Sequence, residues 1–146
     1  MTARDGAEYR LALAQSYLTE ARRALGQGTW WAAALQSQMC VENAAKAAHA
    51  HVKPVPRTHD IAAALAELFT GLEATETQQE AAQELIEIAR RYGHRAHVEF
   101  SYGREEEFKT PSEVVTPELA RQSVADATRA LELVAIIRDT EATEPL

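Results

Sequence analysis

Hydrophobic residues recur at intervals of three and four along much of the chain, a spacing that predicts amphipathic α-helices. The first predicted helix runs from about Ala7 to Leu25, and its apolar stripe comprises Leu11, Ala14, Leu18, Ala21 and Leu25. Gly26 then supplies a C-terminal stop. A second helix is predicted from about Trp30 to Val52. Because the link between the two helices is short, we expect them to pack as an antiparallel hairpin.

Prolines break the chain after the second helix. Pro54 and Pro56 remove backbone donors and disfavour helix in the residues before them. Thr58 is expected to cap a third, shorter helix that runs through about Phe69. Asp60 then lies near the positive end of that helix, where a negative charge is favourable.

Two further helix starts follow from capping patterns. Thr77-Gln78-Gln79-Glu80 has the spacing of a capping box and predicts a fourth helix that ends near Gly93. Thr116-Pro117-Glu118 combines a cap, a proline in the first turn and an acid, and predicts a last helix that ends near Asp139. Residues 98–115 contain aromatic residues, three consecutive glutamates and a proline, so we expect an irregular loop there.

These elements predict an all-α, up-and-down bundle of four main helices plus one short helix. At 146 residues the chain fits one domain over residues 1–146, with frayed ends at about 1–6 and 140–146. The charge is the first property that limits function, because 15 Lys and Arg against 22 Asp and Glu give a net charge of −7. Such a chain repels phosphate at long range, so any nucleic-acid function must depend on a local basic site.

The cysteine content and the absence of long apolar runs indicate the compartment. Cys40 is the one cysteine and lies among apolar and small residues, so we expect a buried, inert thiol in a reducing cytoplasm. No uninterrupted apolar run approaches membrane-spanning length, and residues 1–6 do not resemble a signal peptide. We therefore expect a cytoplasmic protein without a membrane partner.

One local basic site stands out, the run Arg90-Arg91-Tyr92-Gly93-His94-Arg95-Ala96-His97. Five residues separate Arg91 from His97, and six separate Arg90 from His97. An arginine that holds a phosphate and a histidine that moves a proton are the minimum that metal-free cleavage of RNA requires. A solvated helix end is the alternative interpretation, because basic residues offset the negative end of the helix dipole.

A second pattern covers the second and third predicted helices. Trp30-Trp31-Ala32-Ala33 is followed by the run from Gln38 to Ala47, which includes Glu42 and Lys46, and then by Thr58-His59-Asp60-Ile61. This pattern resembles the HEPN domain (higher eukaryotes and prokaryotes nucleotide-binding). Glu42 and Lys46 are four residues apart and can pair on one helix face, and His59 can hydrogen-bond within the bundle. For this polar cluster we favour a structural role.

The resemblance implies a helical bundle that commonly dimerises. In the ribonuclease branch of the family, an Arg followed after four to six residues by a His lies at the end of the penultimate long helix, and two copies form one composite cleft. Arg91 and His97 fit that motif as the catalytic pair, while Arg90, Arg95 and His94 are the candidate phosphate- or nucleotide-binding residues. Tyr92 departs from the small polar residue that usually follows the Arg, and Gly93 loosens the helix inside the motif.

Three functions remain open from the sequence. The first is a metal-independent, toxin-like endoribonuclease that uses the Arg-x5-His motif and produces a 2′,3′-cyclic phosphate. The second is a non-catalytic HEPN bundle that binds a nucleotide or docks a minimal nucleotidyltransferase or antitoxin partner. The third is a structural dimerisation module.

No metal or cofactor is expected. The histidines have no Cys pair, His-Glu-x-x-His motif or convergent third ligand to accompany them. The chain also lacks a glycine-rich phosphate loop, which excludes a Walker or Rossmann mechanism. Trp30 and Trp31 are expected to serve as a core anchor and an interface residue, because neighbouring helix positions cannot both point inward.

Overall fold

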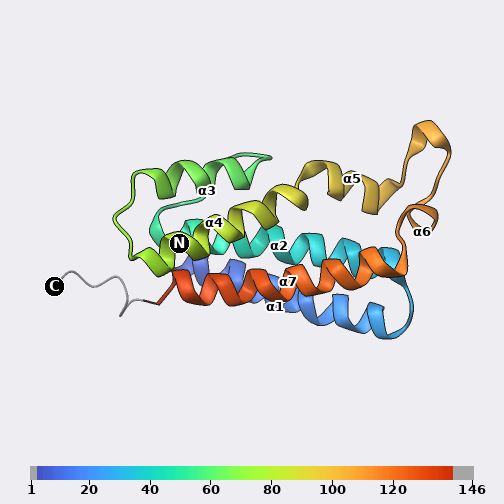
Figure 1. The fold of residues 1–146 in the computed structure, drawn as a ribbon, viewed down its shortest axis with the longest axis horizontal. Helices are drawn as coiled ribbons and strands as arrows, with labels where there is room; N and C mark the ends of the chain where they lie inside the picture. The colour runs from blue at the N-terminus through green and yellow to red at the C-terminus, as the bar shows by residue number, and fades with distance from the viewer. Residues whose placement is uncertain (1–2, 140–146) are drawn as a thin grey trace.

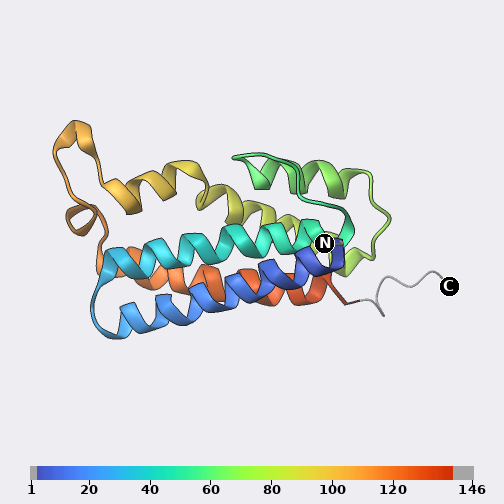
Figure 2. The ribbon, with the colours of Figure 1, turned by 180° about the vertical axis from the view of Figure 1, so that it is seen from behind.

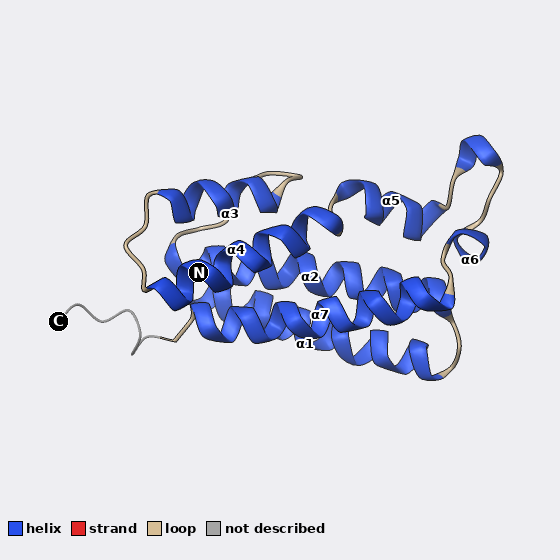
Figure 3. Ribbon diagram, viewed as in Figure 1, coloured by secondary structure: helices blue, strands red, loops and turns tan. Residues whose placement is uncertain are grey.

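A computed structural model describes residues 3–139, which form seven α-helices, one short 3-10 helix and no β-strand. Figure 3 shows this all-helical composition. The bounds are α1 (Ala3–Gly26), α2 (Trp30–Val52), α3 (Ile61–Thr70), α4 (Glu76–Arg91), α5 (His94–Tyr102), η1 (Glu105–Glu107), α6 (Pro111–Val114) and α7 (Pro117–Ile137). The all-α prediction is confirmed, and α2 has the bounds expected from the sequence.

The body of the molecule is a bundle of the four long helices α1, α2, α4 and α7. Figures 1 and 2 show α1 and α2 as an antiparallel hairpin with α7 alongside both, and α4 crosses α2 and α7. The predicted hairpin is thus present. The short helix α3 packs on α4 and α2, and α5 continues from α4 along α2.

Helix α2 lies at the centre of the bundle because much of its surface is small and apolar. It packs against α1, α3, α4, α5 and α7. Its buried alanines are Ala33, Ala34, Ala44, Ala45, Ala47, Ala48 and Ala50. Alanine has the highest helix propensity and lets neighbouring backbones approach closely, so this composition favours both the helix and its central place.

Two of the predicted helix starts are wrong. Helix α3 is capped by Asp60, whose Oδ1 accepts from the backbone of Ala63 at 3.0 Å, and Thr58 instead accepts from the backbone nitrogen of Asp60. Helix α4 opens with a capping box formed by Thr75 and Gln78, two residues before the expected one. In each case a second residue with a short polar side chain lies within a turn of the expected cap, and spacing alone does not decide between the two.

The loop expected over residues 98–115 is also only partly correct. Helix α5 continues to Tyr102, and a short hairpin then pairs Arg104 with Lys109 before α6 begins. Gly103 permits this turn because its φ is +75° and a Cβ there would clash with the Lys109 carbonyl oxygen. Residues 103–110 project from the end of the bundle opposite the one where α1 begins and α7 ends (Figure 1).

The ends of the described chain meet at one end of the bundle, where Arg138 forms an ion pair with Glu8. Helix α1 already begins at Ala3, so residues 3–6 are helical. The remaining positions of the predicted frayed ends, 1–2 and 140–146, lie outside the described residues. Within residues 3–139, no helix combines the length and apolar character needed to cross a membrane.

Candidate functional site

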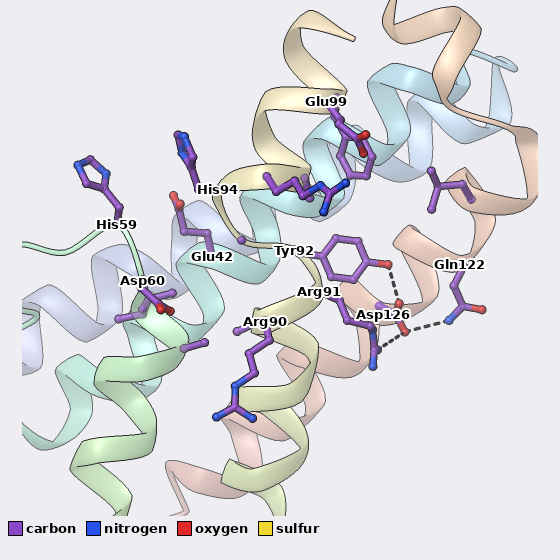
Figure 4. A pocket seen from close by; sticks show the side chains of 18 residues that line it. Glu42, His59, Asp60, Arg90, Arg91, Tyr92, His94, Glu99, Gln122 and Asp126 are labelled. Carbon is purple, nitrogen blue, oxygen red and sulfur yellow. Dashed lines mark hydrogen bonds and ion pairs between the residues drawn. The ribbon is translucent and has the colours of Figure 1, made fainter. Parts of the chain in front are cut away.

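A half-open cavity of about 910 Å³ lies at the junction of α4 and α5 and extends to α3 and α7 (Figure 4). Its polar lining consists of Glu42, His59, Asp60, Arg90, Arg91, Tyr92, His94, Arg95, Glu99, Gln122 and Asp126. The volume is in the range of small-molecule sites. The cavity contains most of the residues that the sequence analysis selected, from both the basic run and the polar cluster.

The junction exists because α4 ends at Arg91 and a new helix begins at His94. Tyr92 is the C-terminal cap of α4, and Gly93 is the N-terminal cap of α5. The predicted end of the fourth helix near Gly93 is thus correct, but the expectation that Arg91 and His97 lie together at the end of one helix is wrong, because the break divides the basic run. Arg90 and Arg91 belong to α4, whereas the three basic side chains after Gly93 project from α5.

Two arginines of the cavity carry positive charges that no described residue neutralises. Arg90 and Arg95 are exposed, and neither forms a hydrogen bond or ion pair with the residues that the structure describes. In Figure 4, the Arg90 guanidinium extends away from Asp126 and toward the α3 side. Side chains with this exposure and no partner are available to bind an anion.

The four carboxylates of the lining are all engaged by other groups. Glu42 pairs with Lys46 at 3.6 Å, as predicted, and Asp60 caps α3. Glu99 Oε1 accepts from Arg104 Nε at 2.9 Å. Asp126 accepts hydrogen bonds from Tyr92 and Gln122. The cavity therefore combines partnered negative charges with unpartnered positive ones, which favours an anionic ligand despite the net charge of the chain.

Asp126 is a buried carboxylate on α7 that accepts two hydrogen bonds and forms one ion pair. Tyr92 Oη donates to Asp126 Oδ2 at 2.6 Å, and Gln122 Nε2 donates to Oδ1 at 2.9 Å. Arg91 Nη2 lies 3.5 Å from Oδ1. Burial and the hydrogen bond to Asp126 raise the pKa of the Tyr92 hydroxyl above its ordinary value, so this group stays neutral. Asp126 thus fixes Arg91 along the wall that faces α7 (Figure 4).

His97 lies apart from the cavity lining, on the side of α5 that faces α2. Its Nδ1 lies 2.8 Å from Gln38 Oε1, and the ring is half-buried. Within one chain, Arg91 therefore reaches toward α7 and His97 toward α2. Among the described residues, no hydrogen bond or ion pair joins the two side chains of the predicted catalytic pair.

His59 and His94 lie on the exposed side of the cavity. Their ring centroids are 6.3 Å apart, and Figure 4 shows the two rings near each other. The expectation that His59 hydrogen-bonds within the bundle is wrong, because its side chain is exposed and has no hydrogen bond among the described residues. In residues 3–139, no group of three or more His, Cys, Asp or Glu side chains is arranged to hold a metal ion.

Sequence reasoning missed Gln38, Asp126 and the contribution of Tyr92. Asp126 and Gln38 are 8% and 0% exposed, yet each is polar and lies in a helix whose apolar stripe surrounds it. The sequence does contain a signal for these residues, because each is a polar residue at a position where the helix pattern calls for an apolar one. A buried polar group of this kind requires a hydrogen-bond partner. Tyr92 appeared as a departure from the motif, whereas it is 5% exposed and anchors the junction.

Cys40 and the two tryptophans of α2 lie outside the cavity. Cys40 is fully buried, and desolvation raises the pKa of its thiol to about 12, as expected of an inert cysteine. Trp30 packs against the core and has the guanidinium of Arg121 5.6 Å from its ring centroid. Trp31 is 37% exposed. Trp30 is thus the more inward of the two and packs against the core, while the interface role expected of Trp31 stays a prediction.

Comparison with known proteins identifies a family and a similar fold. The family model of the HEPN domain matches residues 7–138. Among solved structures, the crystal structure of TT1696 from Thermus thermophilus superposes with a TM-score of 0.64 at 24% sequence identity, over 88% of this chain and 95% of that one. At this identity the likeness concerns the fold alone. No curated protein matches the chain.

Proposed function

The chain belongs to the HEPN domain family, and on this premise we propose that its cavity binds the phosphate of a nucleotide or of RNA. The observation that carries the proposal is the pair of unpartnered guanidiniums, Arg90 and Arg95, in a cavity whose carboxylates are all engaged. Guanidinium groups match phosphate oxygens in charge and in geometry. Exposed His59 and His94 add donors at the open side.

The test is a comparison of two double variants that lose the same charge. Isothermal titration calorimetry measures binding of ATP, GTP and a short single-stranded RNA to the wild type. Arg90→Ala with Arg95→Ala should weaken binding by roughly tenfold or more per arginine, because each charge-assisted hydrogen bond contributes about 1.5–3 kcal/mol. Arg22→Ala with Arg23→Ala removes two exposed arginines from α1 and is the matched control.

Binding to the wild type should weaken as salt is added, because the contacts are ionic. Equal losses in the two double variants would assign the binding to net charge and would contradict a specific site. A wild type that binds none of the three probes at millimolar concentration would refute the proposal.

RNA cleavage is the second candidate function, and the placement of His97 favours it. Because Gln38 bonds Nδ1, the other ring nitrogen, Nε2, is available to take a proton. We propose that His97 removes the proton of a ribose 2′-hydroxyl and that Arg91, together with Arg95, stabilises the negative charge that develops on the phosphate. The 2′-oxygen bonds to phosphorus as the bond from phosphorus to the 5′-oxygen breaks, the 5′-oxygen takes a proton from water, and a 2′,3′-cyclic phosphate results.

We propose that this chemistry uses a second copy of the chain. Arg91 is held by Asp126 on α7 and His97 by Gln38 on α2, so the two residues face different helices in one protomer. We propose that a homodimer brings the arginine of one copy to the histidine of the other. Mixing inactive Arg91→Ala and His97→Ala proteins should then restore part of the activity, whereas a site within one chain would stay inactive in the mixture.

The cleavage assay uses purified protein and RNA in EDTA, with an all-deoxy strand of the same sequence beside it. The wild type should cut only the RNA. His97→Ala should abolish cutting, and His51→Ala, at the far end of α2, should leave it unchanged. Intact RNA after incubation with the wild type would leave phosphate binding without cleavage as the function.

Partner and compartment belong to the same proposal. We propose a minimal nucleotidyltransferase or an antitoxin as a protein partner, and the cytoplasm as the compartment. The buried, reduced thiol of Cys40 is compatible with a reducing environment. Co-purification of the tagged chain with the product of an adjacent gene would test the partner.

A further inference from the structure

Gln38 is a polar residue in the middle of α2 and is 0% exposed. It lies beneath the junction of α4 and α5 and forms two hydrogen bonds across it. Its Nε2 donates to the backbone carbonyl oxygen of Tyr92 at 3.0 Å, and its Oε1 lies 2.8 Å from His97 Nδ1. A fully buried amide is costly unless both of its ends are bonded, and here both are.

The chemistry of these groups fixes the direction of both hydrogen bonds. A backbone carbonyl oxygen only accepts, so the NH₂ group of Gln38 must face Tyr92. The amide oxygen of Gln38 then faces His97, and because this oxygen also only accepts, His97 Nδ1 must carry the hydrogen. In a neutral ring only one nitrogen carries a hydrogen, so Nε2 has a free lone pair.

We propose that Gln38 is a positioning residue that holds neutral His97 in the Nδ1–H tautomer and presents Nε2 as the base. The catalytic consequence rests on the RNA-cleavage function proposed above, whereas the tautomer itself does not. Gln38 touches neither substrate nor reacting atoms and acts only through His97.

The break between α4 and α5 makes this arrangement possible. Tyr92 is the C-terminal cap of α4, and its carbonyl lies at the end of that helix, where it is free to accept from Gln38. The hydroxyl of the same residue bonds Asp126, which holds Arg91. Tyr92 therefore connects the support of Arg91 to the support of His97. A continuous set of contacts runs from Arg91 through Asp126, Tyr92 and Gln38 to His97.

Nuclear magnetic resonance of the ¹⁵N-labelled full chain tests the proposal directly. Long-range proton–nitrogen correlation spectra report which ring nitrogen carries hydrogen, and the spectrum of His97→Gln assigns the signals of His97. At a pH where the ring is neutral, the wild type should show a protonated Nδ1 and an unprotonated Nε2. Gln38→Glu keeps the acceptor that faces His97, although it loses the donor to the Tyr92 carbonyl oxygen, and it should preserve this pattern.

Gln38→Met keeps the approximate shape and removes the acceptor, so the Nε2–H tautomer should become substantially populated. Gln36→Met, two residues earlier on α2, is the matched control and should leave the His97 signals unchanged. A wild type with hydrogen on Nε2 overturns the proposal, as does a Gln38→Met spectrum identical to that of the wild type. If Gln38→Met does not fold, the wild type and Gln38→Glu still decide, because an Nε2–H ring in either overturns it.

Kinetics separate this inference from the proposed function. If the wild type cleaves RNA, Gln38→Met should lower kcat by about tenfold to a hundredfold with little change in KM, a part of the roughly 10²–10⁴-fold that acid–base catalysis contributes. Gln38→Glu should retain more of the activity than Gln38→Met. If the wild type does not cleave RNA, the cleavage proposal fails, whereas the NMR spectra still decide whether Gln38 holds His97 in the Nδ1–H tautomer.

Discussion

The hydrogen bond between Tyr92 and Asp126 offers a quantitative test of how the α4–α5 junction is held to α7. Tyr92→Phe removes only the hydroxyl and leaves the ring in place. The hydroxyl donates at 2.6 Å to a carboxylate, and the two residues are 5% and 8% exposed. The bond is thus short, charge-assisted and shielded from water, which are the conditions in which a hydrogen bond contributes most.

The size of the effect follows from what remains after the substitution. Hydrogen bonds to charged groups contribute about 1.5–3 kcal/mol. Asp126 keeps Gln122 and Arg91 after the change, so its charge is not left unpaired, and the cost belongs at the lower end of that range. We expect Tyr92→Phe to lower the free energy of unfolding by about 1.5 kcal/mol. For a chain of this length, that corresponds to a fall in Tm of roughly 3–6 °C.

Urea unfolding followed by circular dichroism measures this difference, with Tyr102→Phe as the control. Tyr102 is 65% exposed, so its hydroxyl should contribute less than about 0.5 kcal/mol. If Tyr92→Phe were as stable as the wild type, the contribution assigned to the buried hydroxyl would be wrong. If Tyr92→Phe lowered the free energy of unfolding by well above about 3 kcal/mol, Gln122 and Arg91 alone would not be enough to stabilise the buried charge of Asp126.

The same variant has a predicted pH dependence. Folding raises the pKa of Tyr92, so the neutral hydroxyl is favoured in the folded state and ionisation is favoured in the unfolded one. The stability that this group contributes is therefore present below the ordinary tyrosine pKa of about 10 and is lost as the pH rises beyond it. The difference between the wild type and Tyr92→Phe should be constant near neutral pH and should shrink in alkali.

Three other predictions address the core, the thiol and the projecting hairpin. Leu85→Ala should cost about 2–5 kcal/mol in urea unfolding because Leu85 is fully buried, whereas Leu13→Ala, at a partly exposed position of α1 outside the core, should cost far less. Cys40, whose thiol pKa is raised to about 12 by burial, should not react with a thiol reagent at pH 8 unless the chain is unfolded by denaturant; rapid labelling of the folded protein would contradict this. Gly103→Ala should open the hairpin to limited proteolysis because its Cβ would clash with a backbone oxygen, while Gly26→Ala, with free space around it, should be cleaved no faster than the wild type.

The sequence predicted the long helices well because their signals are repeated. Each long helix carries several turns of apolar stripe, and the cap of the last one, Thr116, adjoins a proline, which restricts the alternatives. Short elements carry fewer signals. Helix α5 spans nine residues with one buried side chain, Phe100, so its periodicity was too brief to distinguish from a loop.

The sequence was enough to identify most residues of the candidate site, but not to predict how their side chains are oriented. The basic run was evident, but its division at Gly93 sends Arg91 and His97 toward different helices. That outcome depends on which buried partner each side chain finds, Asp126 in one case and Gln38 in the other. Both partners are more than 30 positions distant in sequence from the residue that they hold, and local spacing contains no information about such contacts.

The alanine-rich surface of α2 has a consequence for how this protein tolerates change. Alanine has no side-chain rotamers to lose on folding, so the packing around α2 depends on backbone proximity. A larger residue at Ala34, Ala44 or Ala48 would push a neighbouring helix outward, and glycine would weaken the helix itself. Residues larger than alanine and the smaller glycine are therefore both expected to destabilise the bundle at these positions. Helix α2 also carries Gln38, so a displacement of its backbone by a fraction of an ångström would change the hydrogen-bond distances from Gln38 to Tyr92 and His97. Substitutions elsewhere on α2 can therefore alter the position of His97 even though they do not contact it.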